Sequence, residues 1–381
     1  MIPAAGPEGL LGARFARGFV LVDREDGRVT VGLGQGKDPG DRRPSVRILP
    51  FDPDDPRDPG PWAPPPPLVP RWVATRTRPG DPPRWCGDAP PREGPPGSPP
   101  PLPAPGRLEL PPEEAVVRRV KEALAAVHAG GAEKIVPSCG ARLVFPAPPA
   151  PGALVAGLLA AGGPPGASTR FAILSGGRLL LGATPERLFR LRPGGILEAE
   201  ALAGTASPGE GKRLLASPKD RAEHDLVVRD IRRALAPLAE ELVVPRAPRV
   251  RSVPGLVHLH TPVTARLRPG VTPAGVLAAL HPTPAVAGAP RERALEWLRA
   301  REPARGAFAA PLLVEHDDGT VEASVLLRTA VLQGNVLHLR AGAGIVAGSD
   351  PVREAREILA KLRATVASLG IRPSATGEVP A

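Results

Sequence analysis

Apolar and polar positions alternate with two different periods along this chain of 381 residues. Residues 113–129 repeat apolar side chains at helical spacing, from Val116 to Val127, directly after a Pro-Pro pair that favours a helix start. Residues 10–35 instead alternate apolar runs with polar turns, as the strands of a hairpin do. The two patterns predict a helix over 113–129 and an opening β-hairpin over 10–35.

The same two patterns predict the remaining elements. Strands are expected around 133–146, in a Gly-Gly hairpin at 171–183, at 257–267, as a pair at 311–332 and at 335–341. Helices are expected near 152–161, from Thr184-Pro185-Glu186-Arg187, from Ser217 to near Leu242, at 273–280, at 290–301 and from Pro351 to Leu369, before a frayed tail. The mixed order without a repeated unit favours one α+β domain.

A proline-rich segment separates the hairpin from the first long helix. Residues 39–112 hold 26 of the 54 prolines of the chain. Proline cannot donate to a sheet ladder and favours extended backbone. We therefore expect extended connections between short strands here, with an unstructured linker as an equal alternative.

The formal charge of +10, from 49 basic and 39 acidic residues, would by itself suggest nucleic acid or an anionic membrane as partner. Tyrosine is absent and aromatic residues make up 3% of the chain, so few side chains could stack on bases.

Cys86 and Cys139 offer neither a disulfide framework nor metal-ligand spacing. No apolar run near the start reaches the roughly 18 residues of a membrane span. We expect a soluble cytoplasmic protein with a small anionic substrate; a basic nucleic-acid-binding or regulatory module is the alternative outside enzymes.

One carboxylate falls on the apolar face of the long helix expected after Ser217. Glu223 shares that face with Val227 and Ile231. A buried carboxylate without a partner is costly, so Glu223 should meet a cation, a metal ion or a hydrogen-bond donor. The alternative is a position at the edge of the apolar stripe, from which the side chain reaches water.

The last expected helix places Glu354, Glu357 and Lys361 on one face. Such a face is often a solvated set of ion pairs. The loop before it, AGAGIVAGSD, contains glycines that let backbone amides approach a ligand at the helix N-terminus, where an anion or a metal-bound carboxylate could lie.

The glycines of that loop also approach a dinucleotide fingerprint. Gly342, Gly344 and Gly348 follow an expected strand and precede a helix, but the spacing is one residue too long. Too little chain follows for the second strand and its ribose-binding acid. A nicotinamide enzyme is therefore not expected.

Four other polar positions allow two interpretations each. Lys134 borders an apolar strand. If its side chain is buried, burial favours the neutral amine that a general base needs. The alternative is a lysine on an edge strand whose side chain faces water. Glu186 fits ordinary capping in the first turn of its expected helix, and a site role would require that the fold place it in a pocket. His258 and His260 alternate on a strand and share one side, where core or surface roles are favoured over metal binding because no third ligand has recognisable spacing.

Seven collinear segments between roughly residues 134 and 370 resemble the chorismate-utilising enzymes, the family of isochorismate, salicylate, anthranilate and aminodeoxychorismate synthases. They are LGATPERL (181–188), ALAGT (201–205), LLASPKDRAEHDLVV (214–228), LVHLHTPV (256–263), LHPTPAVAGAP (280–290), VEASVLLRTA (321–330) and AGAGIVAGSDPVREAREILAKL (341–362). The first 130 residues resemble the family weakly.

This resemblance implies an α+β fold with two large antiparallel sheets packed together and helices on the outside. Residues 1–112 would form the proline-rich N-terminal β part, residues 113–370 the chorismate-binding catalytic region, and residues 371–381 a tail. Monomers are the expectation that the family gives.

The resemblance further implies a Mg²⁺ site beside a site for chorismate. Glu223 and Glu357 correspond to the metal ligands, with Asp220 and Glu354 behind them; two carboxylates suit an ion that dehydrates reluctantly. The residues implied to contact chorismate are the anion partners Arg328 and Lys361, the backbone contacts Gly204, Thr205 and Gly342, the aromatic wall Phe308, and His258 near the ring.

Two residues would carry the reaction. Lys134 corresponds to the base that activates water for attack at C2, where family members that use ammonia tend to have glutamine. Glu186 corresponds to the acid that protonates the departing C4 hydroxyl, so its carboxyl must hold a proton. LHPTPAVAG is closer to isochorismate synthases than to salicylate synthases. The resemblance therefore implies a Mg²⁺-dependent isochorismate synthase, an isomerase, with a salicylate synthase or the first component of an anthranilate or aminodeoxychorismate synthase as alternatives.

Overall fold

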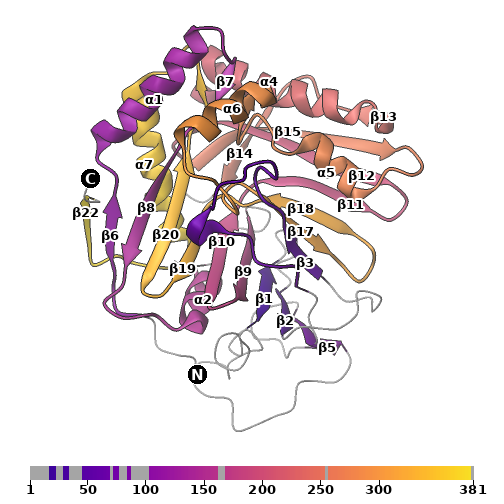
Figure 1. Cartoon of the computed structure of the whole chain (residues 1–381). Helices are drawn as coiled ribbons and strands as arrows, with labels where there is room; N and C mark the ends of the chain where they lie inside the picture. The colour runs from indigo at the N-terminus through magenta and orange to yellow at the C-terminus, as the bar shows by residue number, and fades with distance from the viewer. Residues whose placement is uncertain are drawn as a thin grey trace.

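The computed structural model describes residues 17–22, 29–33, 45–68, 72–76, 84–86, 103–161, 168–253 and 256–378. In this part of the chain two large sheets lie next to each other, with the helices placed around them (Figure 1). The α+β fold class expected from the sequence is confirmed. Parts of the proline-rich segment 39–112 lie outside the described residues, and its described parts contain short strands, as expected.

The larger sheet has eleven strands. Neighbouring strands pair antiparallel except at one edge, where β22 pairs parallel with β6. In spatial order the strands are β22 (Ala375–Glu378), β6 (Arg107–Leu110), β8 (Ser138–Val144), β20 (Val336–Gly342), β19 (Thr329–Gln333), β10 (Arg178–Thr184), β9 (Thr169–Ser175), β1 (Gly18–Val22), β2 (Val29–Leu33), β4 (Trp72–Arg76) and β5 (Arg84–Cys86).

The second sheet has eight strands, all paired antiparallel. Its path runs through β13 (Ala239–Val243), β15 (Leu256–Leu267), β12 (Ile196–Ala206), β11 (Arg187–Arg192), β18 (Val321–Val325), β17 (Pro311–Glu315) and β3 (Ser45–Ile48), while β14 (Arg249–Val253) pairs with β15. A third, small sheet places β7 (Lys134–Ile135) between β16 (Gly288–Ala289) and β21 (Ile345–Val346).

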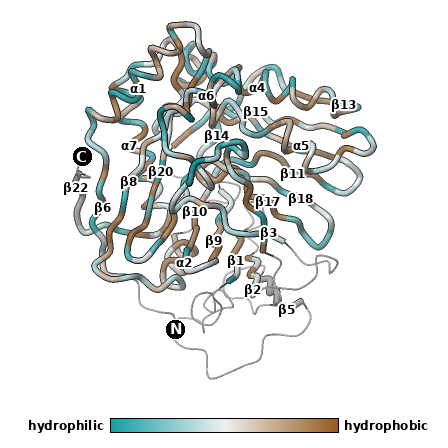
Figure 2. Tube along the Cα trace, in the orientation of Figure 1, coloured by the Kyte–Doolittle hydropathy of each residue, from teal (hydrophilic) through white to brown (hydrophobic). Residues whose placement is uncertain are grey.

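Helices cover the outside of the sheets. They are α1 (Glu113–His128), α2 (Pro151–Ala160), α3 (Gly211–Ala216), α4 (Pro218–Leu235), α5 (Pro273–Leu280), α6 (Arg291–Arg301) and α7 (Pro351–Ser368), with a short 3₁₀ turn, η2, at Gly60–Trp62. Helices α1 and α7 pack against each other, and α4 packs on β12. Hydrophobic stretches follow the central strands, whereas hydrophilic stretches lie on outer helices such as α4 (Figure 2). Among the described residues, no helix is long and apolar enough to cross a membrane.

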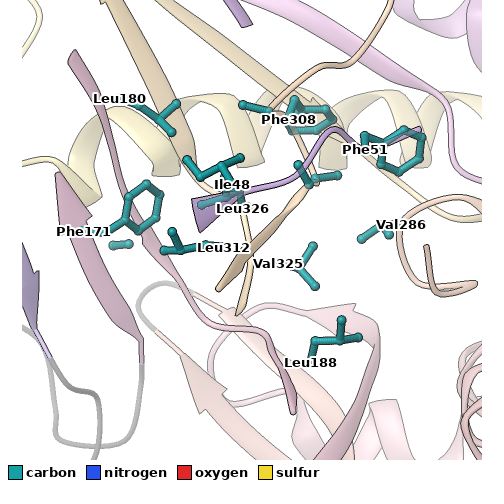
Figure 3. Close-up of a cluster of buried hydrophobic side chains, with 14 of the residues drawn as sticks. Ile48, Phe51, Phe171, Leu180, Leu188, Val286, Phe308, Leu312, Val325 and Leu326 are labelled. Atoms are coloured by element: carbon teal, nitrogen blue, oxygen red, sulfur yellow. The ribbon is translucent and has the colours of Figure 1, made fainter. Parts of the chain in front are cut away.

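Apolar side chains of the two large sheets meet in one core. Figure 3 shows Phe171 of β9 and Leu180 of β10 gathered with Leu312 of β17 and Ile48 of β3, and these side chains are buried. Each side chain of this size that leaves water contributes about 1.5–3 kcal/mol to folding. Contacts across this core hold the second sheet against the larger one.

Most elements with a strong sequence pattern lie where the pattern predicts. The β1–β2 hairpin, helix α1 and the β9–β10 hairpin are confirmed, and the turn of the second hairpin has Gly176 and Gly177 at positive φ. Helices α5, α6 and α7 and strand β15 are also confirmed, to within one residue at each end.

Four local predictions were wrong. Residues 187–192 form strand β11 instead of a helix that starts at Thr184, because this segment pairs with β12 on one side and β18 on the other while the side chains of Leu188, Phe189 and Leu191 are buried. Helix α4 ends at Leu235 rather than near Leu242, since Pro237 cannot continue a helix and β13 begins at 239. The segment 311–332 holds three strands rather than two, and residues 375–378 of the expected frayed tail pair with β6.

Candidate active site

A cavity of about 110 Å³ opens where the sheets and helices α4 and α7 come together. Of the residues expected in a site, those that line it are Glu186, Gly204, Thr205, Glu223, His258, Phe308, Arg328, Gly342, Glu357 and Lys361. Its size suits a small molecule rather than a polymer. The structure thus brings together residues that lie up to 175 positions apart.

Lys134 lies in the wall behind this lining. It occupies the central strand of the small sheet, where it pairs with Ala289 on one side and Val346 on the other, and its side chain is completely buried. The Nζ atom donates a hydrogen bond to Oε1 of Glu223 on α4 at 2.9 Å. The alternative of an edge-strand lysine that faces water is therefore wrong.

Gly344 makes this close arrangement possible. A Cβ atom at this position would lie 2.4 Å from Oε1 of Glu223 and 2.4 Å from Cε of Lys134. Both distances are far below van der Waals contact, so a side chain here would displace the pair. From the sequence, Gly344 was notable only as a member of the glycine-rich loop before the last helix, and this packing role was not predicted.

Three ammonium groups keep Glu223 ionised. Burial acts to raise the pKa of the Glu223 carboxyl, but Lys134, Lys219 and Lys361 outweigh it and lower that pKa below its usual value. The alternative in which Glu223 reaches water at a stripe edge is wrong, because the residue is 8% exposed. It is a buried carboxylate that faces a cavity, as the apolar face of its helix indicated.

The second carboxylate, Glu357, belongs to the last helix. It pairs with Lys361 at 2.8 Å, and Nζ of Lys361 also donates to the carbonyl oxygen of Gly342 at 3.1 Å. Both the ion-pair interpretation and the site interpretation of this face hold, since the pair itself lines the cavity.

Asp220 and Glu354 lie beside these carboxylates rather than in the cavity lining. Both are buried, and Lys219 connects them, with Nζ 2.6 Å from Oε1 of Glu354 and 4.0 Å from Oδ1 of Asp220. Burial raises the pKa of Glu354 while Lys219 opposes that effect. Lys219 was not singled out from the sequence.

Glu186 lies in the loop between β10 and β11, not in a helix. It is 6% exposed. Burial, followed by the charge of Glu200, raises the pKa of its carboxyl to about 8, although Lys134 and Lys361 act in the opposite direction. At neutral pH this carboxyl holds a proton, which is the state that a general acid requires.

His258 offers a neutral imidazole to the cavity. Its Nδ1 lies 3.2 Å from both the hydroxyl of Thr205 and the carbonyl oxygen of Gly204 on the neighbouring strand β12. Burial, and then the charges of Lys361 and Arg328, lower the pKa of His258 to about 3. Its Nε2 is buried with no hydrogen-bond partner among the described residues, so it can bond to a ligand. His260 instead bonds to Glu200 through Nε2 at 3.1 Å, outside the cavity lining.

The remaining predicted contacts are an arginine and an aromatic ring. Arg328 has a positive φ of 48°, and burial lowers the pKa of its guanidinium to about 10. The ring of Phe308 packs edge-on against Trp62, with the ring centroids 5.7 Å apart. Both residues line the cavity, which gives it a cationic and an aromatic wall.

A buried ionic cluster next to Phe308 was missed. The carboxylate of Glu302 accepts hydrogen bonds from Ser138, Arg305 and Arg340, and both guanidinium groups lie within 5.7 Å of the Phe308 ring centroid. Arg305 also donates to the carbonyl oxygens of residues 136 and 286. The i, i+3 spacing of Glu302 and Arg305 was the available signal, but it says nothing about the distant partner strands.

Carboxylates are the groups here that could hold a metal ion. Among the described residues, no group of three or more His, Cys, Asp or Glu side chains comes together as a metal site. Glu223 and Glu357 nevertheless line the same cavity, and Glu223 is ionised. Magnesium is commonly held by one or two protein carboxylates together with substrate and water, so this donor set fits it.

Comparison with known proteins agrees with the geometry. A sequence model described as "Chorismate binding enzyme" matches residues 98–370. The "Salicylate biosynthesis isochorismate synthase" of Pseudomonas aeruginosa is 44% identical over 203 residues, which cover 51% of this chain and 42% of that protein. "Isochorismate synthase MenF" of Bacillus subtilis is 36% identical over 211 residues, covering 52% of this chain and 44% of that protein.

These alignments span less than half the length of the two curated relatives. A solved structure, the menaquinone-specific isochorismate synthase MenF from Escherichia coli, matches more broadly. It covers 96% of this chain and 92% of its own, with a TM-score of 0.78 at 25% identity. Since the family match extends over most of the chain and includes every residue of the cavity lining, the chain belongs to the chorismate binding enzyme family.

Proposed function

We propose that this protein is an isochorismate synthase, which adds water at C2 of chorismate with loss of the C4 hydroxyl. The observation that carries the proposal is the combination, at one cavity, of a fully buried lysine and a buried carboxyl that is protonated at neutral pH, Lys134 and Glu186. The relatives named isochorismate synthases support the same activity.

In the proposed mechanism Lys134 acts as general base. Lys134 reacts as the neutral amine, after its ammonium has given one proton to solvent. The amine then forms a hydrogen bond to a water molecule and takes a proton from it as the water oxygen attacks C2, and proton exchange with solvent afterwards resets Lys134 and Glu186. Glu186 gives its proton to the C4 hydroxyl, which leaves as water. One water enters and one leaves, so the reaction is an isomerisation.

Cationic and neutral donors would position the substrate. Arg328 and Lys361 supply charge for its carboxylates, and the neutral imidazole of His258 offers Nε2 to the ring side. Phe308 closes one wall, while backbone groups at 204, 205 and 342 contribute hydrogen bonds. Burial of these groups strengthens each electrostatic contact because the cavity excludes most water.

The proposal includes Mg²⁺ as cofactor, held by Glu223 and Glu357 with Asp220 and Glu354 behind them. When bound, the ion would supply positive charge that binds and polarises a substrate carboxylate. A cytoplasmic location, which the low cysteine count supports, belongs to the same proposal, as does the monomeric state that the family resemblance implies.

Product analysis tests the proposal. Purified protein is incubated with chorismate and Mg²⁺, with and without an ammonium salt, and products are identified by chromatography and mass. Isochorismate in both samples is the expected result. Salicylate with pyruvate would indicate a salicylate synthase, and anthranilate in the ammonium sample would overturn the role given to Lys134.

A further inference from the structure

The peptide group that joins Glu186 to Arg187 is held at both of its polar atoms. The carbonyl oxygen of Glu186 accepts a hydrogen bond from the backbone N–H of Val325 on β18 at 3.0 Å. The N–H of Arg187 donates to Oε1 of Glu200 on β12 at 3.1 Å. The backbone at Glu186 is therefore fixed between two strands, by a backbone N–H of β18 on one side and by the Glu200 side chain of β12 on the other.

The Glu200 side chain acts at an irregular point of the sheet. The ladder between β11 and β12 ends at Phe189↔Ala199, and the pairing of β11 with β18 shifts register between Arg187 and Phe189. The N–H of Arg187 lies beyond the end of the β11·β12 ladder, where the carboxylate of Glu200 accepts it. An N–H left without an acceptor inside a protein is destabilising, so this contact stabilises the irregular backbone.

Glu200 is held in place as a carboxylate. It is 7% exposed, and its Oε2 accepts from Nη1 of Arg251 on β14 at 2.6 Å and lies 3.1 Å from Nε2 of His260 on β15. A guanidinium at this distance favours the ionised form. Glu200 does not line the cavity, so it acts on the site through Glu186 and not through a ligand.

The negative charge of Glu200 raises the pKa of the Glu186 carboxyl. Burial is the main reason that the pKa of Glu186 rises to about 8, and Glu200 is the next. Lys134 from β7 and Lys361 from α7 act in the opposite direction, and His258 from β15 is neutral. Glu200 therefore adds to the effect of burial and opposes the effect of the two lysines on the pKa of Glu186.

We propose that Glu200 is a positioning residue for Glu186: its carboxylate fixes the irregular backbone that presents Glu186 and holds a negative charge beside the Glu186 carboxyl, which therefore enters the reaction protonated. This inference rests on the proposed function, in which Glu186 donates that proton to the departing hydroxyl. Glu200 thus extends the site by a residue that does not touch the substrate.

Two variants separate the charge from the hydrogen bond. Glu200→Gln keeps the size of the side chain and an acceptor for the N–H of Arg187 but removes the charge. We expect kcat at low pH to stay near the wild-type value, and the basic limb of the pH profile of kcat to move to lower pH by about one unit. Glu200→Asp keeps the charge but shortens the side chain, so kcat should fall at every pH with the basic limb in its original place. Glu241→Gln, which changes an exposed glutamate on β13 of the same sheet, is the control and should change neither.

A second readout does not depend on turnover. The carboxyl of Glu186 is titrated by difference infrared spectroscopy in the ligand-free protein, with Glu186→Gln identifying its band. A lower titration midpoint of Glu186 in Glu200→Gln supports the inference. An unchanged midpoint in Glu200→Gln, or a loss of kcat in Glu200→Gln that is equal at all pH values, overturns it. If the protein does not convert chorismate, the infrared titration still decides the role of Glu200, and the proposed function fails separately.

Discussion

The Nζ atom of Lys134 lies 2.9 Å from Oε1 of Glu223, although 89 positions separate the two residues in the chain. The proposed base and a proposed metal ligand are thus hydrogen-bonded partners inside the protein. Removing one member of a buried pair leaves the other charge without compensation, at a cost of about 3–5 kcal/mol. Both the stability and the activity of variants at either residue must therefore be measured.

Lys134→Ala should lower kcat by about two to four orders of magnitude, the range that general acid-base catalysis contributes. The variant should still fold and bind chorismate, because Arg328 and Lys361 remain in the cavity. Steady-state kinetics with circular dichroism checks both statements. The control is Lys121→Ala on the exposed face of α1, and turnover near the wild-type value in Lys134→Ala would exclude this residue as the base.

Glu223→Ala should raise the Mg²⁺ concentration needed for half-maximal activity, since one of two carboxylates in the cavity is lost. Activity titrations with Mg²⁺, and calorimetry with Mg²⁺ alone, measure the change. Asp225→Ala removes an exposed carboxylate from the same helix and should leave the titration unchanged. An identical Mg²⁺ response in Glu223→Ala and the wild type would contradict the ligand role.

Gly344→Ala should reduce kcat by about 100-fold, the loss that a displacement near 1 Å can cause. The new Cβ would collide with the Lys134–Glu223 pair, 2.4 Å from an atom of each residue. Gly348→Ala in the same loop is the matched control, because its Cβ would meet Lys219 at an ordinary 3.8 Å. Equal kinetics for the two variants would show that the close packing has no part in catalysis.

Glu186→Gln should change the pH dependence of stability. Because the pKa of Glu186 is raised from 4.5 to about 8 in the folded state, its stabilising contribution is complete below pH 4.5 and is lost as the pH rises to about 8. Glutamine has no proton to lose, so the Tm of the variant relative to wild type should increase over that interval and level off above it. Thermal unfolding followed across this range measures the difference; a constant difference would mean that Glu186 titrates normally.

The sequence supported the fold where periodicity and turn chemistry agreed, as in α1, α5 and the β9–β10 hairpin. It failed at residues 184–192, where Thr184, Pro185 and Glu186 satisfy the rules for a helix start. The pairing of this segment with two neighbouring strands and the burial of Leu188, Phe189 and Leu191 outweigh those local preferences. The end of α4 at Leu235 was predictable in principle, because Pro237 is a local signal for a helix end, but the apolar pattern was extended past it to Leu242.

For the site, the chain showed which residues could carry chemistry but not how they are held. The burial of Glu223 followed from its apolar helix face. Gly344, Glu200 and Glu302 could not be predicted, because their roles depend on contacts between strands and helices that are distant in the sequence. Tertiary packing creates these contacts, and no local pattern encodes them.

Chorismate conversion in ¹⁸O-labelled water tests the central claim most directly. If Lys134 activates water for attack at C2, the isochorismate formed with Mg²⁺ should carry one labelled oxygen in its ring hydroxyl, found by mass spectrometry. The Lys134→Ala protein should form this product far more slowly. Isochorismate without the label, or no isochorismate from folded wild-type protein, would contradict the account.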